Sequence, residues 1–342
     1  PSEYNGIKIF STDGRKLDDA LEDEIEGRLL RGSTCQPGEA GIKLVDHRAA
    51  EAYIEFLRNA SPIPLGGLPI AVDCANGSSS VTAQLLFESL GAKVHMLSNQ
   101  PDGRNINKDC GSLHMENLQK AVVEHKLAAG FAFDGDADRV LAVDEHGSMV
   151  DGDQILAMCA LDMLGRGALV NRTLVATVMS NFGLRVFCKE YGINFRAAQV
   201  GDRFVLDELL AGAYSLGGEQ SGHIIFTALS TAGDGQLTAL QILQIMLRTG
   251  KPLSELANVM EHCPQVQRNI PVSQLGKLRL ADDVEIQSAA AEAQKLLGED
   301  GRVLLRASGT EPLVRVMAEG RDAGRIKTIA HELEEVVRKQ LL

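Results

Sequence analysis

The chain has 342 residues, enough for roughly two to four domains, and 44% of them are hydrophobic while 23% are charged. Its formal net charge is -12, and it contains no Trp and only 4% aromatic residues. This composition disfavours nucleic acid and anionic membranes as partners, because both prefer basic surfaces and nucleic acid also uses aromatic stacking. A small anionic substrate would therefore need a pocket that concentrates Arg, Lys, a metal ion or helix N-termini.

The sequence has no signal peptide and no apolar run of about 18 residues, so we expect a soluble, cytoplasmic protein. Its cysteines lie far apart and form no C-x-x-C pair, which is typical of reduced cysteines in a protein core. They are Cys35, Cys74, Cys110, Cys159, Cys188 and Cys263.

Residues 1–43 are too few to bury a core of their own. We predict a strand at Ile7–Phe10 and an acidic helix of about ten residues from Asp18. The chain opens on Pro1 in polar, turn-rich sequence, so we expect its natural beginning to be missing. A second helix is predicted at 44–60. Its buried face should carry Leu44, Ala49, Ala52, Tyr53 and Phe56.

Two later segments share the order strand, loop, helix, Gly, strand, which is that of a βαβ unit. The first has strands at 68–73 and 93–97, with a helix at 81–90 between them. The second has strands at 173–178 and 194–200, again with a helix between them. Short apolar strands that alternate with helices indicate doubly wound α/β domains with parallel sheets.

The last section has a different pattern. Helices at 282–297 and 323–341 enclose two neighbouring strands at 302–305 and 313–317, an order that fits a small α+β domain. We predict a linker at 264–271, because a proline stands at each end of that segment.

Three carboxylates, Asp134, Asp136 and Asp138, follow the apolar segment 128–133, where ligands bind in open α/β sheets. Such a cluster repels itself unless a cation neutralises it, and hard oxygen ligands select Mg²⁺ or Ca²⁺. An open site with few protein ligands suits Mg²⁺ holding a phosphate oxygen, and Arg139 would add a fixed positive charge for a phosphoryl group. A solvated acidic turn is one alternative. An EF-hand is another, although Arg139 stands where that loop requires Gly.

The segment Gly217–His223 alternates glycines with a carboxylate, a hydroxyl and an imidazole. This arrangement suits sugar hydroxyls, with Glu219 accepting hydrogen bonds while Ser221 and His223 bridge. The alternative is a hairpin turn with an incidental His.

Two neighbouring segments carry weaker signals. We interpret Val200–Arg203 as a loop that ends the strand before it. Asp234 is predicted to cap the apolar helix at 237–246.

A third polar segment lies near the C-terminus. Ser308, Gly309 and Thr310 offer two hydroxyls and backbone N–H groups, and Arg306 and Arg315 flank them, which favours a small anion nest. An ordinary polar turn is the alternative. The sequence has no G-x-x-x-x-G-K-[ST] segment, so nothing in it indicates nucleotide hydrolysis.

Taken together, Asp134–Arg139, Gly218–His223 and Arg306–Thr310 resemble the metal, sugar and phosphate loops of the α-D-phosphohexomutases. They come in that family's order, at spacings of about one domain each, and the resemblance covers essentially the whole chain. The segments that resemble the branch of the family acting on hexosamine phosphates are Gln220, Val200–Arg203 and Glu311–Val316. The start, Asn5–Lys8, also resembles the family, in which this segment follows the active-site serine loop by a few residues.

The resemblance implies a fold of repeated doubly wound α/β domains plus a smaller C-terminal α+β domain, arranged around a central cleft. It implies a remnant of the first α/β domain at 1–43, a metal-binding domain at 44–152, a sugar-binding domain at 153–263 and a phosphate-binding α+β domain at 264–342.

The activity implied is interconversion of glucosamine 6-phosphate and glucosamine 1-phosphate through a phosphoserine, a 1,6-bisphosphate and Mg²⁺, within amino-sugar and cell-wall precursor synthesis. Such phosphoryl transfer depends on in-line positioning and charge neutralisation. The implied roles are metal binding for Asp134, Asp136 and Asp138, catalysis for Lys8, Arg139 and His223, substrate binding for Asp202, Arg203, Glu219, Ser221 and His223, and phosphate binding for Arg306, Ser308, Gly309, Thr310 and Arg315. For Lys8, a solvated strand lysine is the alternative.

The family's serine should stand just before Pro1, and Ser78–Ser80 cannot replace it because they open a helix elsewhere. We therefore expect this chain alone to bind sugar phosphate without mutase turnover. The alternatives are a phosphoglucomutase or phosphomannomutase, a binding fragment, and a metal-dependent sugar phosphatase. The residues do not fix the oligomeric state, and a homodimer is kept as the expectation.

Overall fold

The computed structural model describes residues 2–4, 6, 9–12, 17, 19–32, 42, 48–308 and 311–342. The chain divides into two compact units, one formed by Pro1–Met179 with Ile193–Val259 and the other by Ser180–Gly192 with Met260–Leu342. The expected division at residues 43, 152 and 263 stays a prediction. The predictions that fall wholly or partly outside the described residues concern Ile7–Phe10, Lys8, Cys35, Leu44, Gly309 and Thr310.

Near the N-terminus the described elements are a short 3₁₀ helix, η1 (Ser2–Tyr4), and α1 (Asp19–Leu30). The second of these confirms the acidic helix predicted from Asp18. The described cysteines, all of the six except Cys35, are free and buried, as expected for core residues.

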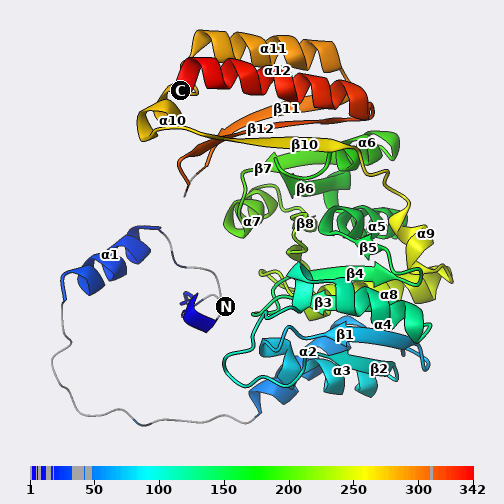
Figure 1. Cartoon of the computed structure of the whole chain (residues 1–342). Helices are drawn as coiled ribbons and strands as arrows, with labels where there is room; N and C mark the ends of the chain where they lie inside the picture. Colours follow the sequence, from blue (N-terminus) through cyan, green and yellow to red (C-terminus); the bar gives the residue numbers. More distant parts are fainter. Residues whose placement is uncertain are drawn as a thin grey trace. The chain divides into compact units, whose positions relative to one another are not determined.

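The first sheet of the larger unit has five strands in the order β2-β1-β3-β4-β5 (Figure 1). The strand β1 pairs in parallel with β2 and β3, as predicted for a βαβ unit, whereas β4 and β5 add antiparallel strands at one edge. The strands are β1 (Pro69–Asp73), β2 (Lys93–Leu97), β3 (Ala129–Phe133), β4 (Val140–Asp144) and β5 (Met149–Val150).

Helices cover both faces of this sheet, which is why its central strand is apolar on both sides. Leu118 and Val122 of α4 pack on Ala132 at one face. On the other face, the ring of Phe131 stacks on Phe87 of α3 with 6.5 Å between centroids. The helical elements around this sheet are η2 (Ser78–Val81), α3 (Ala83–Ser89), η3 (Gly111–Leu113) and α4 (Glu116–Glu124).

The helix α2 (Ala49–Ala60) forms where a helix was predicted, but among the described residues of the predicted buried face only Tyr53 is partly buried. Phe56 is 41% exposed and Ala52 is exposed, whereas Leu57 is fully buried and Tyr53 is half buried. The helix packs against α3 and α8, so the stripe through Tyr53 and Leu57 is the one that becomes buried.

The second sheet has the order β7-β6-β8-β9, with β6 parallel to β7 and β8 and β9 antiparallel at the edge. The helix α7 packs on it through Val205 and Leu209, which contact Val175. The helix α5 starts at a capping box in which Asp151 accepts a hydrogen bond from the Gln154 N–H at 3.0 Å. The elements are β6 (Thr173–Thr177), β7 (Asn194–Ala198), β8 (Leu216–Gly218), β9 (Ile224–Phe226), α5 (Gly152–Gly165), η4 (Val170–Arg172), α7 (Asp202–Ala211), α8 (Gly235–Thr249) and α9 (Leu253–Ala257).

The helix α8 links the two sheets of the larger unit, because it contacts β3 and β4 as well as α5. Gln236 donates to the Thr82 hydroxyl at 2.8 Å, and Gln244 donates to the backbone oxygen of Ile63 at 2.9 Å. A helix that follows the second sheet in sequence therefore covers the first sheet in space.

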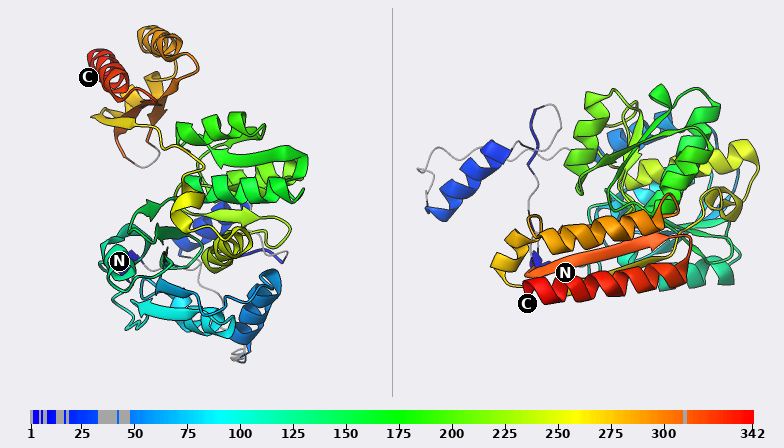
Figure 2. Two further views of the ribbon diagram at one scale, coloured as in Figure 1. Left: turned by 90° about the vertical axis from the view of Figure 1, so that its right-hand side faces the viewer. Right: turned by 90° about the horizontal axis from the view of Figure 1, so that it is seen from above.

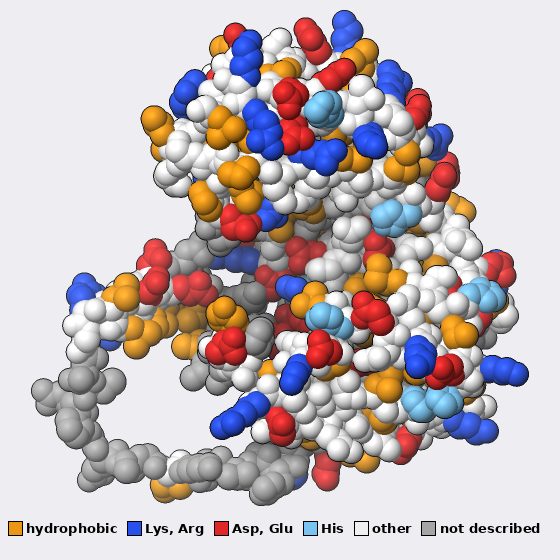
Figure 3. Space-filling view, in the orientation of Figure 1, with side chains coloured by type: hydrophobic (Ala, Val, Ile, Leu, Met, Phe, Trp, Pro, Cys, Tyr) orange, Lys and Arg blue, Asp and Glu red, His pale blue; other side chains and the backbone are white. Residues whose placement is uncertain are grey.

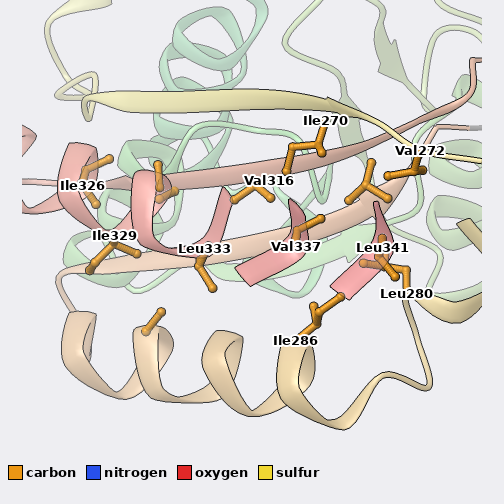
Figure 4. Close-up of a cluster of buried hydrophobic side chains, with 14 of the residues drawn as sticks. Ile270, Val272, Leu280, Ile286, Val316, Ile326, Ile329, Leu333, Val337 and Leu341 are labelled. Carbon is orange, nitrogen blue, oxygen red and sulfur yellow. The ribbon is translucent and has the colours of Figure 1, made fainter. Parts of the chain in front are cut away.

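The smaller unit is built on an antiparallel sheet in the order β10-β12-β11, with α11 and α12 side by side on one face (Figures 1 and 2). Apolar residues at helical spacing in α12, such as Ile329 and Leu333, form a core with Val314 and Val316 of β12 (Figure 4). The elements are α6 (Phe182–Glu190), β10 (Gln265–Pro271), α10 (Gln274–Arg279), α11 (Val284–Leu297), β11 (Gly301–Ala307), β12 (Leu313–Gly320) and α12 (Ala323–Leu341).

The linker predicted at 264–271 is wrong, because this segment is the strand β10. It pairs with β12 from Gln265, opposite Glu319, to Pro271, opposite Leu313. Exposure alternates along most of β10, as it does in a strand with one buried face. A proline is tolerated there because β10 is an edge strand and Pro271 is its last residue.

The helix α6 connects the parallel strands β6 and β7, so the second predicted βαβ unit is confirmed. In addition, α6 packs against β12 in the smaller unit, which was not predicted. The Asn181 side chain exchanges two hydrogen bonds with the backbone of Cys263, at 3.0 and 2.9 Å. Arg302 pairs with the fully buried Glu319 and donates to the backbone oxygen of Ser180 at 2.6 Å. Polar contacts that no local pattern reveals therefore attach this helix to the C-terminal sheet.

Basic and acidic side chains alternate on the face of the smaller unit that Figure 3 shows. Glu334 of α12, for example, pairs with Arg338 at 2.8 Å and with Arg268 at 3.4 Å. Among the helices that the structure describes, none combines the length and the apolar character needed to cross a membrane.

Candidate metal and sugar-phosphate site

The acidic loop begins where β3 ends, as the sequence predicts. Oxygen atoms of Asp134, Asp136 and Asp138 all lie within 4.8 Å of one another. The turn depends on Ala137, whose φ of 60° is in the left-handed region and whose N–H donates to the Asp134 backbone oxygen at 3.2 Å. The loop therefore gathers three carboxylates at the carboxyl edge of the sheet, in the place where α/β folds bind ligands.

Both alternatives for this loop fail. Phe133 of β3 pairs antiparallel with Val140 of β4, so strands rather than the helices of an EF-hand flank the loop. A freely solvated turn does not fit either, because the side chain of Asp134 is only 19% exposed. Its carboxylate accepts a hydrogen bond from the Arg139 N–H at 3.2 Å.

Electrostatics favour a cation in the acidic loop. Burial, followed by the charges of Asp138 and Asp136, raises the pKa of Asp134 from 3.8 to about 7. The Arg139 guanidinium offsets part of this repulsion, since its Nε lies 3.7 Å from Asp138 Oδ1 and 4.0 Å from Asp134 Oδ2. A divalent cation would remove the rest, and an all-carboxylate donor set suits a hard ion such as Mg²⁺.

The loop at residues 219–223 joins β8 to β9, so the hairpin alternative is correct. Its histidine is not incidental, however, because His223 is buried with only 4% of its surface exposed. Its Nδ1 lies 3.6 Å from Asp138 Oδ2, and its Nε2 lies 4.0 Å from Asp202 Oδ2. The N–H of Gly233 donates to Nε2 at 3.2 Å, so a neutral ring carries its proton on Nδ1, facing the metal loop.

Close backbone approaches fasten this hairpin loop to its neighbours. The Val140 N–H donates to the Gly222 backbone oxygen at 3.1 Å, and the Gly152 N–H donates to the Gln220 backbone oxygen at 3.0 Å. A Cβ at Gly222 would lie 2.1 Å from the Val140 oxygen, and one at Gly152 would lie 2.1 Å from the Glu219 oxygen. Side chains are therefore excluded at both positions, and the loop is held between the metal loop and the start of α5.

The interpretation of Val200–Arg203 as a loop is only half correct. Gly201, with φ of 128°, ends the loop, and Asp202 and Arg203 form the first residues of α7. The Gly201 N–H donates to the Glu219 carboxylate at 3.1 Å. Asp202 thereby lies beside His223 and forms with it and Asp138 a second group of ligating atoms within 4.8 Å of one another.

The cap predicted at Asp234 is confirmed, since its carboxylate accepts from the Leu237 N–H at 2.9 Å. Tyr53 of α2 donates to both carboxylate oxygens at 2.9 Å, and burial raises the pKa of Asp234. The next residue, Gly235, donates its N–H to the Ala137 backbone oxygen at 2.9 Å. The start of α8 is therefore a support of the metal loop.

Sequence reasoning missed the residues that hold the loops rather than face a ligand. Asp151 had a signal, because Asp-x-x-Gln before an apolar run is a capping-box pattern. Its carboxylate also accepts a hydrogen bond from Gln220 at 3.1 Å. No sequence signal identifies Gly152 and Gly233, because the contacts that require glycine there come from residues distant in sequence.

The predicted anion nest belongs to the smaller unit. Arg306 on β11 stands directly opposite Arg315 on β12, so both guanidinium groups start from the same face of the sheet. Like charges in this position repel unless an anion neutralises them. Glu311 supplies part of that charge, with its Oε2 2.8 Å from Arg315 Nη2. Ser308 is buried and closes the turn, since its hydroxyl accepts from the Glu311 N–H at 3.2 Å.

The larger unit brings together most of the predicted site residues. Ser221 is exposed on the hairpin loop, and Arg203 lies at the start of α7, where its Nε is 4.0 Å from Asp207 Oδ2. The smaller unit holds the described part of the anion nest. The predicted residues in the larger unit are Asp134, Asp136, Asp138, Arg139, Asp202, Arg203, Glu219, Ser221 and His223.

Comparisons with known proteins agree with this geometry. Models of the "Phosphoglucomutase/phosphomannomutase" family match alpha/beta/alpha domain II at residues 51–147, alpha/beta/alpha domain III at 151–263 and the C-terminal domain at 268–336. A phosphoglucosamine mutase from Acetivibrio thermocellus is 49% identical over 345 residues, which cover 100% of this chain and 77% of that protein. The chain belongs to the phosphoglucosamine mutases of the phosphohexomutase family.

Other relatives of this phosphohexomutase chain support the assignment. A phosphoglucosamine mutase from Rhodococcus erythropolis is 50% identical over 343 residues, covering 98% of this chain and 76% of that protein. The chain thus spans about three quarters of the length of these relatives.

Solved structures share the fold. A phosphoglucomutase/phosphomannomutase family protein from Burkholderia thailandensis has a TM-score of 0.79 at 23% identity, covering 95% of this chain and 72% of that one. An N-acetylphosphoglucosamine mutase from Aspergillus fumigatus, solved with GlcNAc-6P and magnesium, has a TM-score of 0.70 at 20% identity, covering 86% and 66%. The predicted fold class, repeated α/β domains plus a C-terminal domain, is confirmed.

Proposed function

We propose that the chain carries the divalent-metal site and the sugar-phosphate loops of an enzyme that interconverts glucosamine 6-phosphate and glucosamine 1-phosphate through a 1,6-bisphosphate. The observation that carries this proposal is the junction of the acidic loop with the hairpin loop in one unit, with His223 Nδ1 3.6 Å from Asp138 Oδ2. The neighbouring Glu219 and Ser221 supply polar groups for sugar hydroxyls beside a place for metal-held phosphate.

Asp134, Asp136 and Asp138 would hold Mg²⁺, which supplies positive charge for the oxygens of a transferring phosphoryl group. Arg139 adds a second, permanent positive charge at the same edge of the loop. Because phosphoryl transfer requires neutralised charge and in-line positioning more than covalent help, these groups provide the main part of the chemistry.

The hairpin loop would bind and orient the sugar. Glu219 is itself oriented by the Gly201 N–H and accepts hydrogen bonds from ring hydroxyls, while the exposed Ser221 hydroxyl is accessible to ligand. His223 holds its proton at Nδ1, on the side of the metal loop, so it is arranged as a donor toward that side. Asp202 Oδ2 lies 4.0 Å from its other nitrogen, Nε2.

The non-reacting phosphate would bind to the smaller unit, where Arg306 and Arg315 start from the same face of the sheet. Ser308 belongs to this nest in our proposal, together with Gly309 and Thr310, which lie outside the described residues. The net charge of -12 makes such a local concentration of arginine necessary for an anionic substrate.

Calorimetric titration with glucosamine 6-phosphate, with and without Mg²⁺, tests the proposal without depending on the phosphoryl carrier. We expect saturable binding that tightens when Mg²⁺ is present. Asp136→Asn should remove the Mg²⁺ response, whereas Glu124→Gln, which changes an exposed carboxylate on α4, should leave it intact. No saturable heat for the parent chain, or an unchanged Mg²⁺ response in Asp136→Asn, would refute the proposal.

The same titration separates the neighbouring branches of the family. Glucosamine 6-phosphate should bind more tightly than glucose 6-phosphate and mannose 6-phosphate. Tighter binding of either neutral sugar phosphate would indicate a phosphoglucomutase or phosphomannomutase instead. Steady release of inorganic phosphate from glucosamine 6-phosphate would indicate a phosphatase.

A further inference from the structure

A pocket of ≈ 1040 Å³ opens beside the metal loop in the larger unit, at the upper end of the range for small-molecule sites. One wall is the metal loop, and the others include the turn after β1 and the loop between β2 and η3, which we call the Asn107 loop (residues 98–110). The polar residues of this pocket that matter below are Asn76, Ser78, Asn107, Asp134, Asp136 and Arg139.

Left-handed backbone conformations are concentrated in the loops around this pocket. Ten non-glycine residues of the described chain have positive φ, and six of these lie in the loops that follow β1, β2 and β3. Such conformations persist only where the surroundings enforce them, and they concentrate at functional sites. The six residues are Ala75, Asn76, Ser98, Asn107, Asp109 and Ala137.

Most polar groups of these loops hold the loops together. Buried Asp73 accepts hydrogen bonds from the N–H groups of Ala75 at 2.8 Å and Gly111 at 3.1 Å. Asn105 donates to the Gln100 oxygen at 3.0 Å and accepts from the Asp102 N–H at 3.0 Å. Both ends of the Asn105 amide are therefore used inside the loop.

The side-chain amide of Asn107, unlike that of Asn105, is not used to hold the loop together. Its N–H donates to the Ala75 backbone oxygen at 2.9 Å, which fixes the residue at φ of 58°. Within the described part of the chain, its side-chain amide makes no hydrogen bond. A Cβ placed on Gly135 would lie 2.8 Å from Asn107 Nδ2, so the amide stands directly over the backbone between Asp134 and Asp136. A strained backbone thus presents a polar group to the pocket at the metal loop.

We propose that the Asn107 side-chain amide donates a hydrogen bond to a phosphoryl oxygen held at the metal loop, so that Asn107 is a further phosphate-binding residue of the site. This inference rests on the proposed function. The donor suits this position because phosphoryl oxygens only accept hydrogen bonds, and a neutral amide adds a donor without competing with the carboxylates for the cation.

The test compares Asn107→Gly with Asn105→Ala in calorimetric titrations with Mg²⁺, glucosamine 6-phosphate and glucose 1,6-bisphosphate. Glycine removes the amide and suits the left-handed backbone. The bisphosphate differs from the monophosphate by a second phosphoryl group, which the metal loop would hold. Asn107→Gly should therefore weaken bisphosphate binding by roughly 10- to 100-fold, the range for a hydrogen bond to a charged group. Its affinity for Mg²⁺ and for the monophosphate should change much less.

Asn107→Asp provides a readout that a purely structural role would not give. It keeps the shape of the side chain and its tolerance of positive φ, but it replaces the donor with an anion. Binding of the bisphosphate should fall at least as far as in Asn107→Gly, while Mg²⁺ affinity is retained or increased. If Asn107→Gly has a clearly lower melting temperature than the parent chain, the Asn107→Asp titration alone tests the role of the Asn107 amide.

The outcomes distinguish this inference from the proposed function. If the parent chain binds no sugar phosphate, the proposed function fails. If the parent chain binds the bisphosphate and both Asn107 variants bind it within twofold of the parent, the role of Asn107 is refuted. An equal loss of bisphosphate binding in Asn105→Ala would also refute it, because that result assigns the effect to loop structure.

Discussion

Replacement of Gly222 by alanine tests whether backbone contact between the metal loop and the hairpin loop holds the site. Gly222 has φ of 91°, which costs an alanine about 1–2 kcal/mol. The new Cβ would also lie 2.1 Å from the Val140 oxygen and 2.8 Å from its carbonyl carbon. Both are backbone atoms, so the overlap is relieved only when the two loops move apart. Overpacking and the weakened Val140–Gly222 hydrogen bond add about 2–4 kcal/mol, giving a total of about 3–6 kcal/mol.

The matched control is Gly250→Ala, at the end of α8. Gly250 also has positive φ, 67°, but a Cβ there meets nothing within 4 Å, so only the conformational cost of about 1–2 kcal/mol applies. Denaturant unfolding followed by circular dichroism measures both variants, and titration with glucosamine 6-phosphate should show a loss of affinity only for Gly222→Ala. Equal losses of stability, or undiminished ligand binding by Gly222→Ala, would refute the reasoning.

Two further predictions concern charges. The folded protein holds a proton on Asp134 up to about pH 7, whereas the unfolded chain releases it near pH 4; the metal-free protein should therefore lose stability as pH rises from about 4 through 7. In thermal melts, the loss of stability with rising pH should be smaller in Asp134→Asn, and Mg²⁺ should counteract it in the parent protein. A loss of the same size in Asp134→Asn would contradict the assignment of this pH dependence to Asp134. In the smaller unit, Glu319→Ala leaves Arg302 without its carboxylate partner and should cost about 3–5 kcal/mol. Glu299, which pairs with Lys189, has a side chain that is 86% exposed, so Glu299→Ala should unfold at the parent's denaturant midpoint. A small shift for Glu319→Ala would show that solvent reaches this pair.

The parts of the site that sequence could predict are those set by local rules. Carboxylates after an apolar strand lie at the sheet edge in any α/β unit, so Asp134 and its neighbours could be placed before the fold was known. The helix cap at Asp234 also depends only on the residues that follow it. Local rules do not show that the three loops belong to one site. That prediction came from the resemblance of the loops, in their order along the chain, to those of one family.

The errors arose where distant contacts decide local structure. The face of α2 that becomes buried depends on α3 and α8, and α8 follows α2 by some 180 residues, as the Tyr53–Asp234 hydrogen bond shows. The segment Gln265–Pro271 reads as a linker until β12 is present to pair with it. Helix α6 connects β6 and β7 as the βαβ pattern predicts, but its attachment to Cys263 through Asn181 was not predicted. Periodicity does not contain this information, because the partner residues come from other parts of the sequence.

The acidic loop contains charges that repel one another, yet its shape does not depend on neutralising them. Two backbone hydrogen bonds from outside the loop hold it, from the Ser78 N–H to the Gly135 oxygen and from the Gly235 N–H to the Ala137 oxygen, both at 2.9 Å. A third, from the Val140 N–H to the Gly222 oxygen at 3.1 Å, fixes the start of β4 directly after the loop. These bonds are independent of protonation and of bound ion, so the ligand geometry is set before a cation arrives. Protonation of Asp134, rather than movement of the loop, relieves the repulsion between the carboxylates. Cation binding should therefore displace a proton and leave the backbone where it is.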